Sequence, residues 1–159
     1  MTTFKMDESN LQVLIATADL GAMAFVYSDE QDETKNGCEF ASTVERVTGD
    51  MIDSFEDNDH KVTLSKDDYI VLLIAVRGAF EAFMSLSDGG IKRMLRLFNK
   101  KFDEINQIDI KKMAHTAHIL LDFLECHATN DVLVEWIEER KNTAIGMLEV
   151  VTDAYRETP

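Results

Sequence analysis

Two histidines and an aspartate in the segment "MAHTAHILLDFLECH", residues 113–127, are the side chains of this chain best suited to hold a metal ion. His115, His118 and Asp122 follow one another at spacings of three and four, which places them on one side of a helix. Imidazole and carboxylate groups are ordinary ligands of divalent ions. Helical metal sites usually draw ligands from at least two segments, however, and neither the Glu-x-x-His pair of di-iron bundles nor the zinc-protease motif occurs here. We therefore favour a solvated or interface face in which Asp122 pairs with His118, and we predict no metal and no cofactor.

Other signatures of catalysis are missing from the sequence. It has no phosphate-binding glycine loop, no Gly-x-Ser-x-Gly turn and no Cys-x-x-Cys pair. Cys126 and His127 are adjacent, and neighbouring side chains on a helix point about 100° apart, which is poor geometry for a nucleophile and its base. The sequence favours a binding protein over an enzyme. The alternative is a helical-bundle enzyme or metal sensor that uses His115, His118 and Asp122, within one chain or across a dimer.

Acidic side chains are concentrated in the first 60 residues. The chain has 30 acidic and 16 basic side chains and a formal net charge of −14. Residues 1–60 hold 14 of the acidic and 3 of the basic ones, whereas residues 61–159 hold 16 and 13. This distribution predicts a bipolar molecule whose N-terminal part is strongly negative.

Two acidic patches lie at or beside predicted helix C-termini, where negative charge is unfavourable against the helix dipole. The residues are Asp29, Glu30, Asp32 and Glu33 in the first patch, and Asp50, Asp53, Glu56, Asp57 and Asp59 in the second. One interpretation is a soluble, self-repelling surface. The other is a contact surface for a basic protein partner, such as a nucleic-acid enzyme. Direct binding of DNA or RNA is not expected, because the net charge repels phosphate.

Apolar residues recur at helical spacing along most of the chain, and the only proline is Pro159. We predict a single all-α domain over residues 1–159, an irregular helical bundle of about five to six helices, with residues 1–8 as a flexible N-terminus. The predicted helices span residues 9–28, 40–55, 65–87, 91–105, 110–124 and 130–157.

Capping residues and hydrophobicity refine this prediction. Ser65 and Asp68 form an approximate capping box at the start of the third helix, and Asn130 can cap the last one. Because residues 70–76 are apolar on every side, the third helix should occupy the middle of the bundle.

A second apolar strip on the fifth helix, formed by Ile119 and Phe123, lies apart from its main core stripe. It indicates either a central helix that contacts neighbours on two sides or the seam of a homodimer. The basic amphipathic segment "IKRMLRLFNKKF", residues 91–102, could also meet the acidic region of a second copy. A structural homo-oligomer or assembly factor is therefore another hypothesis.

The first residues lack the basic and apolar regions of a signal peptide, and the apolar run at residues 69–76 is far shorter than a membrane span. With only Cys38 and Cys126, we expect reduced thiols, a cytoplasmic location and no membrane partner. Our first hypothesis is a small acidic protein-binding module. It would be an inhibitor, an immunity or antitoxin protein, or a phage-type effector that engages a basic protein.

Overall fold

The computed structural model describes residues 1–29, 37–85 and 110–139, and the account below is confined to them. In chain order the elements are β1 (Thr2–Lys5), α1 (Glu8–Asp29), α2 (Gly37–Asp57), β2 (Lys61–Leu64), α3 (Lys66–Ser85) and α5 (Ile110–His127), followed by helical residues 130–139. The predicted all-α helical bundle is confirmed. The predicted helix at residues 91–105 and the end of the last predicted helix lie outside the described residues.

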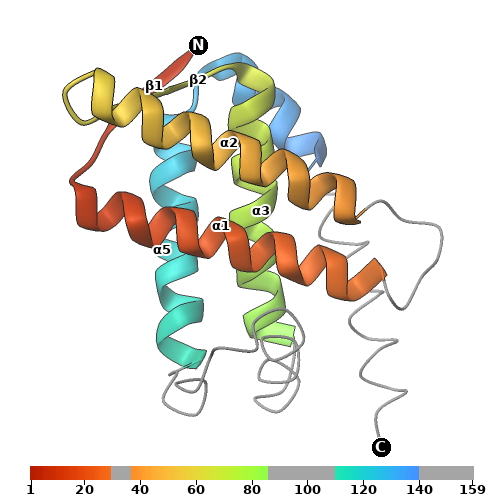
Figure 1. Ribbon diagram of the computed structural model, residues 1–159. Helices are drawn as coiled ribbons and strands as arrows, with labels where there is room; N and C mark the ends of the chain where they lie inside the picture. Colours follow the sequence, from red (N-terminus) through yellow and green to blue (C-terminus); the bar gives the residue numbers. More distant parts are fainter. Residues whose placement is uncertain (30–36, 86–109, 140–159) are drawn as a thin grey trace, which may run out of the picture.

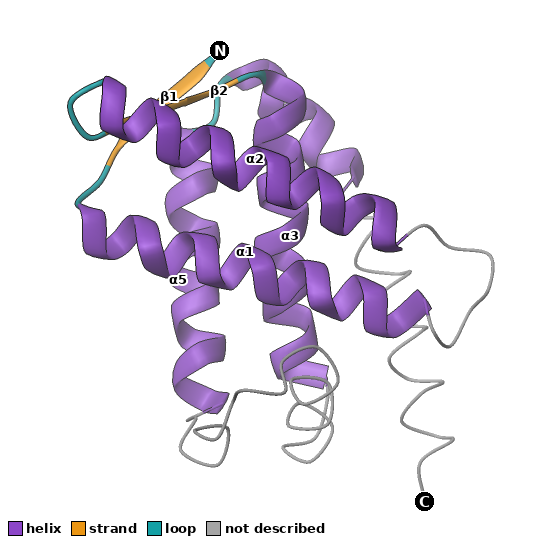
Figure 2. Ribbon diagram, viewed as in Figure 1, coloured by secondary structure: helices purple, strands orange, loops and turns teal. Residues whose placement is uncertain are grey.

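The helices form two crossed layers (Figure 1). In the first layer α1 and α2 run antiparallel side by side, and in the second layer α3 and α5 do the same. Helix α1 crosses over α3 and α2 crosses near the start of α3, while residues 130–139 lie beside the start of α3 and the end of α5 (Figure 2). The main hydrophobic core lies between the layers.

Helix α3 is the central element, as the apolar run in its sequence predicts. It contacts α1, α2, α5 and β2, and Leu72, Leu73 and Val76 are at most 1% exposed. The buried Tyr69 hydroxyl donates a hydrogen bond to the carbonyl oxygen of Leu124 in α5 at 2.5 Å. This bond satisfies a polar group that burial would otherwise destabilise, and it fixes α5 against α3.

The two layers approach most closely where α1 crosses α3. Gly21 of α1 lies directly against the backbone of Ala75, and a methyl group at Gly21 would overlap the Ala75 carbonyl. On the other side of the crossing, a methyl group at Gly78 would lie 2.8 Å from the Phe25 ring. Two glycines therefore allow the helix backbones to pack at short range, which larger side chains would prevent.

A small two-stranded sheet covers one end of the bundle, where the sequence predicts a flexible N-terminus at residues 1–8. Strands β1 and β2 pair antiparallel, with Phe4 opposite Val62. Both of these side chains are buried, and the Phe4 ring contacts the Tyr69 and Phe123 rings edge-on at 6.1 and 5.7 Å. The structure thus differs from the predicted flexible N-terminus, because burial of the Phe4 side chain in the core stabilises strand β1.

Helix starts follow the expected capping chemistry, with one shift. The Asp68 backbone N–H donates to the Ser65 hydroxyl at 3.2 Å, so the predicted cap of α3 is confirmed. Helix α1 begins after Asp7, whose carboxylate accepts from the Asn10 backbone at 2.8 Å. The last described helix begins after Thr129 rather than at a capping Asn130, because the Thr129 carbonyl already accepts the bond from Leu133.

Helix α1 is unusually apolar for a helix in the outer layer. Its segment Glu8–Val26 is the one helix among the described residues that is long and apolar enough, by length and composition alone, to cross a membrane. Only 39% of this apolar segment is buried in the bundle. Its apolar side chains outnumber the positions that contact α2 and α3, which leaves part of its hydrophobic surface exposed.

Candidate functional site

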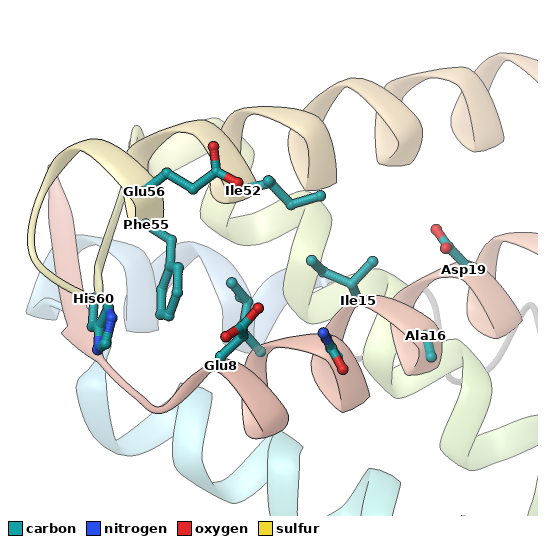
Figure 3. Close-up of a pocket in the computed structure, with 10 residues that line it drawn as sticks. Glu8, Ile15, Ala16, Asp19, Ile52, Phe55, Glu56 and His60 are labelled. Atoms are coloured by element: carbon teal, nitrogen blue, oxygen red, sulfur yellow. The ribbon is translucent and has the colours of Figure 1, made fainter.

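A groove of about 630 Å³ lies between α1 and the C-terminal half of α2 (Figure 3). Its apolar lining is formed by Leu11, Ile15 and Ala16 of α1 and by Ile52 and Phe55 of α2. The side chains of Ile15 and Phe55 point from the two helices toward the space between them. Ile52 remains 41% exposed and Ile15 is half-buried, so the groove presents hydrophobic surface to solvent.

Carboxylates surround this apolar lining. Glu8 and Asp19 lie at opposite ends of the groove on α1, and Glu56 lies on the α2 side. The remaining lining residues are Gln12 and His60, so neither lysine nor arginine lines the groove. The combination of an apolar lining with acidic ends is chemically suited to a ligand that is itself apolar and cationic.

The pKa of the Asp19 carboxylate is raised by its surroundings. Burial raises the pKa of its side chain, and the nearby negative charge of Glu45 raises it further. Both causes disfavour the ionised form in the folded protein. The structure therefore holds an uncompensated negative charge at this end of the groove, and a bound cation would relieve the repulsion.

The turn that ends α2 adds His60 to the lining of the groove. The His60 backbone N–H donates to the Phe55 carbonyl at 3.2 Å, and the two rings stack with centroids 4.7 Å apart and planes 3° from parallel. This bond and contact match a Schellman ending, in which the residue after the helix adopts a left-handed conformation. Asp59 occupies that position with φ of 52°, although glycine is the usual residue there.

Exposed carboxylates continue from the groove around the end of α2. We call Asp53, Glu56, Asp57 and Asp59 the acidic end of α2; all four are exposed. Within the described residues, none of the four forms an ion pair. They also lie in or just beyond the last turns of the helix, which contain no basic residue to offset the negative end of the dipole.

Arg46 is the one basic residue in the sequence of α1 and α2, and its guanidinium is already engaged. It forms hydrogen bonds to both carboxylate oxygens of Asp68 at 2.8 and 3.2 Å, and a third to Asp50 at 3.2 Å. The first of these contacts joins α2 to the start of α3. Arg46 therefore forms no ion pair with the acidic end of α2.

The structure divides the predicted acidic residues into groups. Asp53, Glu56, Asp57 and Asp59 lie together, whereas Asp50 is ion-paired to Arg46 one turn earlier. Asp29 is the last residue of α1. Glu30, Asp32 and Glu33 lie outside the described residues.

The histidine face of α5 has the geometry that its spacing predicts. His118 Nε2 lies 3.4 Å from Asp122 Oδ2, and both side chains are more than half exposed, so the predicted pairing is confirmed. The His118 ring also lies 5.5 Å from that of Phe80 in α3. His115 is exposed on the same helix. Among the described ranges, no group of three or more His, Cys, Asp or Glu side chains is placed to hold a metal ion.

The second apolar strip of α5 is split by the structure. Phe123 packs against Phe4 of β1 and against the ring of His127, with centroids 4.2 Å apart in the second pair. Ile119 is 52% exposed. The sheet therefore supplies a neighbour for Phe123, one that the helical pattern alone does not reveal.

Sequence reasoning missed the α1 side of the groove. Glu8 follows Asp7 at the start of α1, Asp19 is a single acidic residue in an apolar segment, and Ile15 belongs to the apolar pattern that predicts a core-facing stripe. The available signal was the breadth of the apolar surface of α1, which exceeds one stripe. Comparison with known proteins gives no further assignment: no family, no curated protein and no solved structure matches the chain.

Proposed function

We propose that this chain is a small acidic protein-binding module that engages a basic partner protein through the acidic end of α2. The observation that carries the proposal is the gathering of four exposed carboxylates, none ion-paired among the residues that the structure describes, where the helix dipole disfavours them. Such an arrangement lowers the stability of the isolated fold, and a cationic partner would remove that penalty.

Electrostatics also favours a particular class of partner. The net charge of −14 repels nucleic acid and anionic lipid, whereas it attracts a basic protein and accelerates its association. Basic grooves of nucleic-acid enzymes present the complementary charge. We propose inhibition of such an enzyme, in the manner of an immunity, antitoxin or phage-type effector protein, and a cytoplasmic site of action.

The test compares capture by two immobilised proteins. One is the native chain, and the other is the α2-end variant, with Asp53→Lys, Glu56→Lys and Asp57→Lys. Cell extract is applied to both at low salt, and the proteins released by high salt are identified by mass spectrometry. A basic protein retained by the native chain alone is then purified and titrated against both. We expect binding that weakens steeply with salt and is lost in the α2-end variant.

A charge-matched control separates local from global electrostatics. Reversing Glu39, Asp122 and Glu138, exposed acidic residues on α2, α5 and the last described helix, changes the net charge equally. This control variant should bind the purified partner with most of the affinity of the native chain. Equal retention of the purified partner by the native chain and the α2-end variant would contradict the proposal.

A further inference from the structure

We infer that the α1/α2 groove receives the apolar face of a basic amphipathic helix belonging to the partner protein. This inference rests on the proposed function and adds where and by what kind of segment the partner is anchored. The acidic end of α2 would steer the partner, while the groove would supply the buried hydrophobic contact.

The dimensions of the groove suit a helical segment. Its α1 wall extends from Glu8 to Asp19, and a rise of about 1.5 Å per residue makes this about 16 Å, or three helical turns. The opposite wall is Ile52 to Glu56 together with His60. Two or three large apolar side chains, spaced three or four residues apart on a docked helix, would follow such a groove.

Hydrophobic surface in the groove is incompletely covered. Ile15 of α1 and Ile52 of α2 both remain accessible. Only 39% of the apolar segment of α1, Glu8–Val26, is buried. Covering these side chains with apolar atoms would be favourable, because it removes hydrophobic surface from water. Mobile lipid is a poor occupant by comparison, because anionic headgroups would approach the same carboxylates.

Charge complementarity identifies the polar face of the occupant. Glu8, Asp19 and Glu56 surround the apolar lining, and neither lysine nor arginine lines the groove. Lysine or arginine residues flanking the apolar face of a docked helix would meet these carboxylates at the groove ends and along the α2 side. A neutral helix would bury the same apolar atoms without pairing with these carboxylates, and an acidic helix would be repelled by them.

The probe is a synthetic 15-residue peptide of Lys, Leu and Ala whose leucines form one helical face. A scrambled peptide of identical composition lacks that face, and a third peptide replaces Lys with Glu. Each is titrated into the ¹⁵N-labelled full chain and followed by two-dimensional NMR. We expect the first peptide to shift the amide signals of Leu11, Ile15, Ala16, Ile52 and Phe55, and to bind at least about tenfold more tightly than either control.

Two matched variants test the site. Ala16→Phe fills the groove from an exposed helical position, whereas Val134→Phe adds the same ring at a position that is 69% exposed on the last described helix. We expect Ala16→Phe to weaken binding of the first peptide about tenfold and Val134→Phe to leave it unchanged. The NMR signal shifts of the native chain locate the peptide without any variant, so the inference remains testable even if Ala16→Phe folds poorly.

The inference is overturned by shifts centred outside the groove, by equal affinity for the scrambled peptide, or by undiminished binding to a folded Ala16→Phe variant. Its failure is distinguishable from failure of the proposed function. If the purified basic partner binds Ala16→Phe normally but fails to bind the α2-end variant, the function stands and the groove is not the anchor. If the partner binds the α2-end variant normally, the proposed function itself is wrong.

Discussion

The two helical layers of this protein treat charge in opposite ways. In the α3/α5 layer, charged side chains find partners within the fold: Arg77 pairs with Glu81, His118 with Asp122, and Lys66 with Glu135 of the last described helix. In the α1/α2 layer, the single basic residue joins α2 to α3 and the acidic end of α2 has no ion-pair partner among the described residues. The charged residues of the α3/α5 layer stabilise the fold, whereas we propose that the α1/α2 layer keeps its charge available for binding.

The largest effect is expected from a substitution that disrupts the contact between the two layers. Gly21→Ala would place a methyl group against the Ala75 carbonyl, and two packed helix backbones cannot both keep their positions. Because overpacking typically costs about 1–3 kcal/mol and backbone overlap is its severe form, we expect a loss of about 3 kcal/mol. Urea unfolding followed by circular dichroism measures it.

Gly49→Ala is the matched control for that substitution. Gly49 lies in the interior of α2, and a methyl group there would meet nothing within 4 Å. The same change should therefore raise stability by about 0.5–1 kcal/mol, since alanine is the better helix former. Similar effects of both substitutions would refute the close crossing of α1 and α3.

The second prediction concerns the stability of the α2-end variant. Lysines at residues 53, 56 and 57 would face the negative end of the helix dipole and remove mutual repulsion, so the free energy of unfolding should rise by about 1 kcal/mol. Thermal and urea unfolding at low salt measure the gain, which should shrink at high salt. A variant that gains stability while losing its partner would show that these carboxylates are retained for binding; a loss of stability would contradict this account.

Both the helices and the acidic end of α2 were predictable from the sequence, because periodic apolar residues and charge runs are local patterns. The capping of α3 by Ser65 and the pairing of His118 with Asp122 were predictable for the same reason. The strands were not, since four-residue segments with two inward side chains give a weak periodic signal. The groove depends on α1 lying beside α2, and helix pairing is a tertiary property that periodicity does not encode.

The third prediction isolates the backbone at the end of α2. Asp59→Gly should stabilise the fold by about 0.5–1 kcal/mol, because glycine adopts the left-handed conformation at φ 52° more readily than aspartate. It also removes one charge from the acidic end of α2. Asp57→Gly, which removes a charge within the helix, should instead destabilise. Thermal unfolding of both variants compares them, and a gain from both would assign the effect to charge rather than conformation.

The fourth prediction uses the raised pKa of Asp19. In the pH range between its pKa in the unfolded chain and its higher pKa in the folded protein, the folded state holds more protons, so stability falls as pH rises through that range. Above it the full penalty is present. Asp19→Asn should therefore raise the melting temperature slightly at neutral pH, and the difference should vanish below the unfolded-chain pKa of Asp19. A gain that persists at low pH would assign the effect to packing instead of charge.

The smallest effect is expected on the histidine face. His118→Ala removes an ion pair whose side chains are 54% and 61% exposed, and such pairs contribute little in water. We expect unchanged thermal stability, with or without stoichiometric zinc. A zinc-dependent rise in melting temperature that His118→Ala abolishes would make this face a metal site and place function in the α3/α5 layer.

The most direct test of the account is parallel capture by the native chain and the α2-end variant, followed by titration of the retained protein at two salt concentrations. We predict one basic protein that binds the native chain, dissociates with rising salt, and fails to bind the α2-end variant, even though that variant is expected to be more stable. A retained protein that binds both chains equally would show that the acidic end of α2 is not the functional surface.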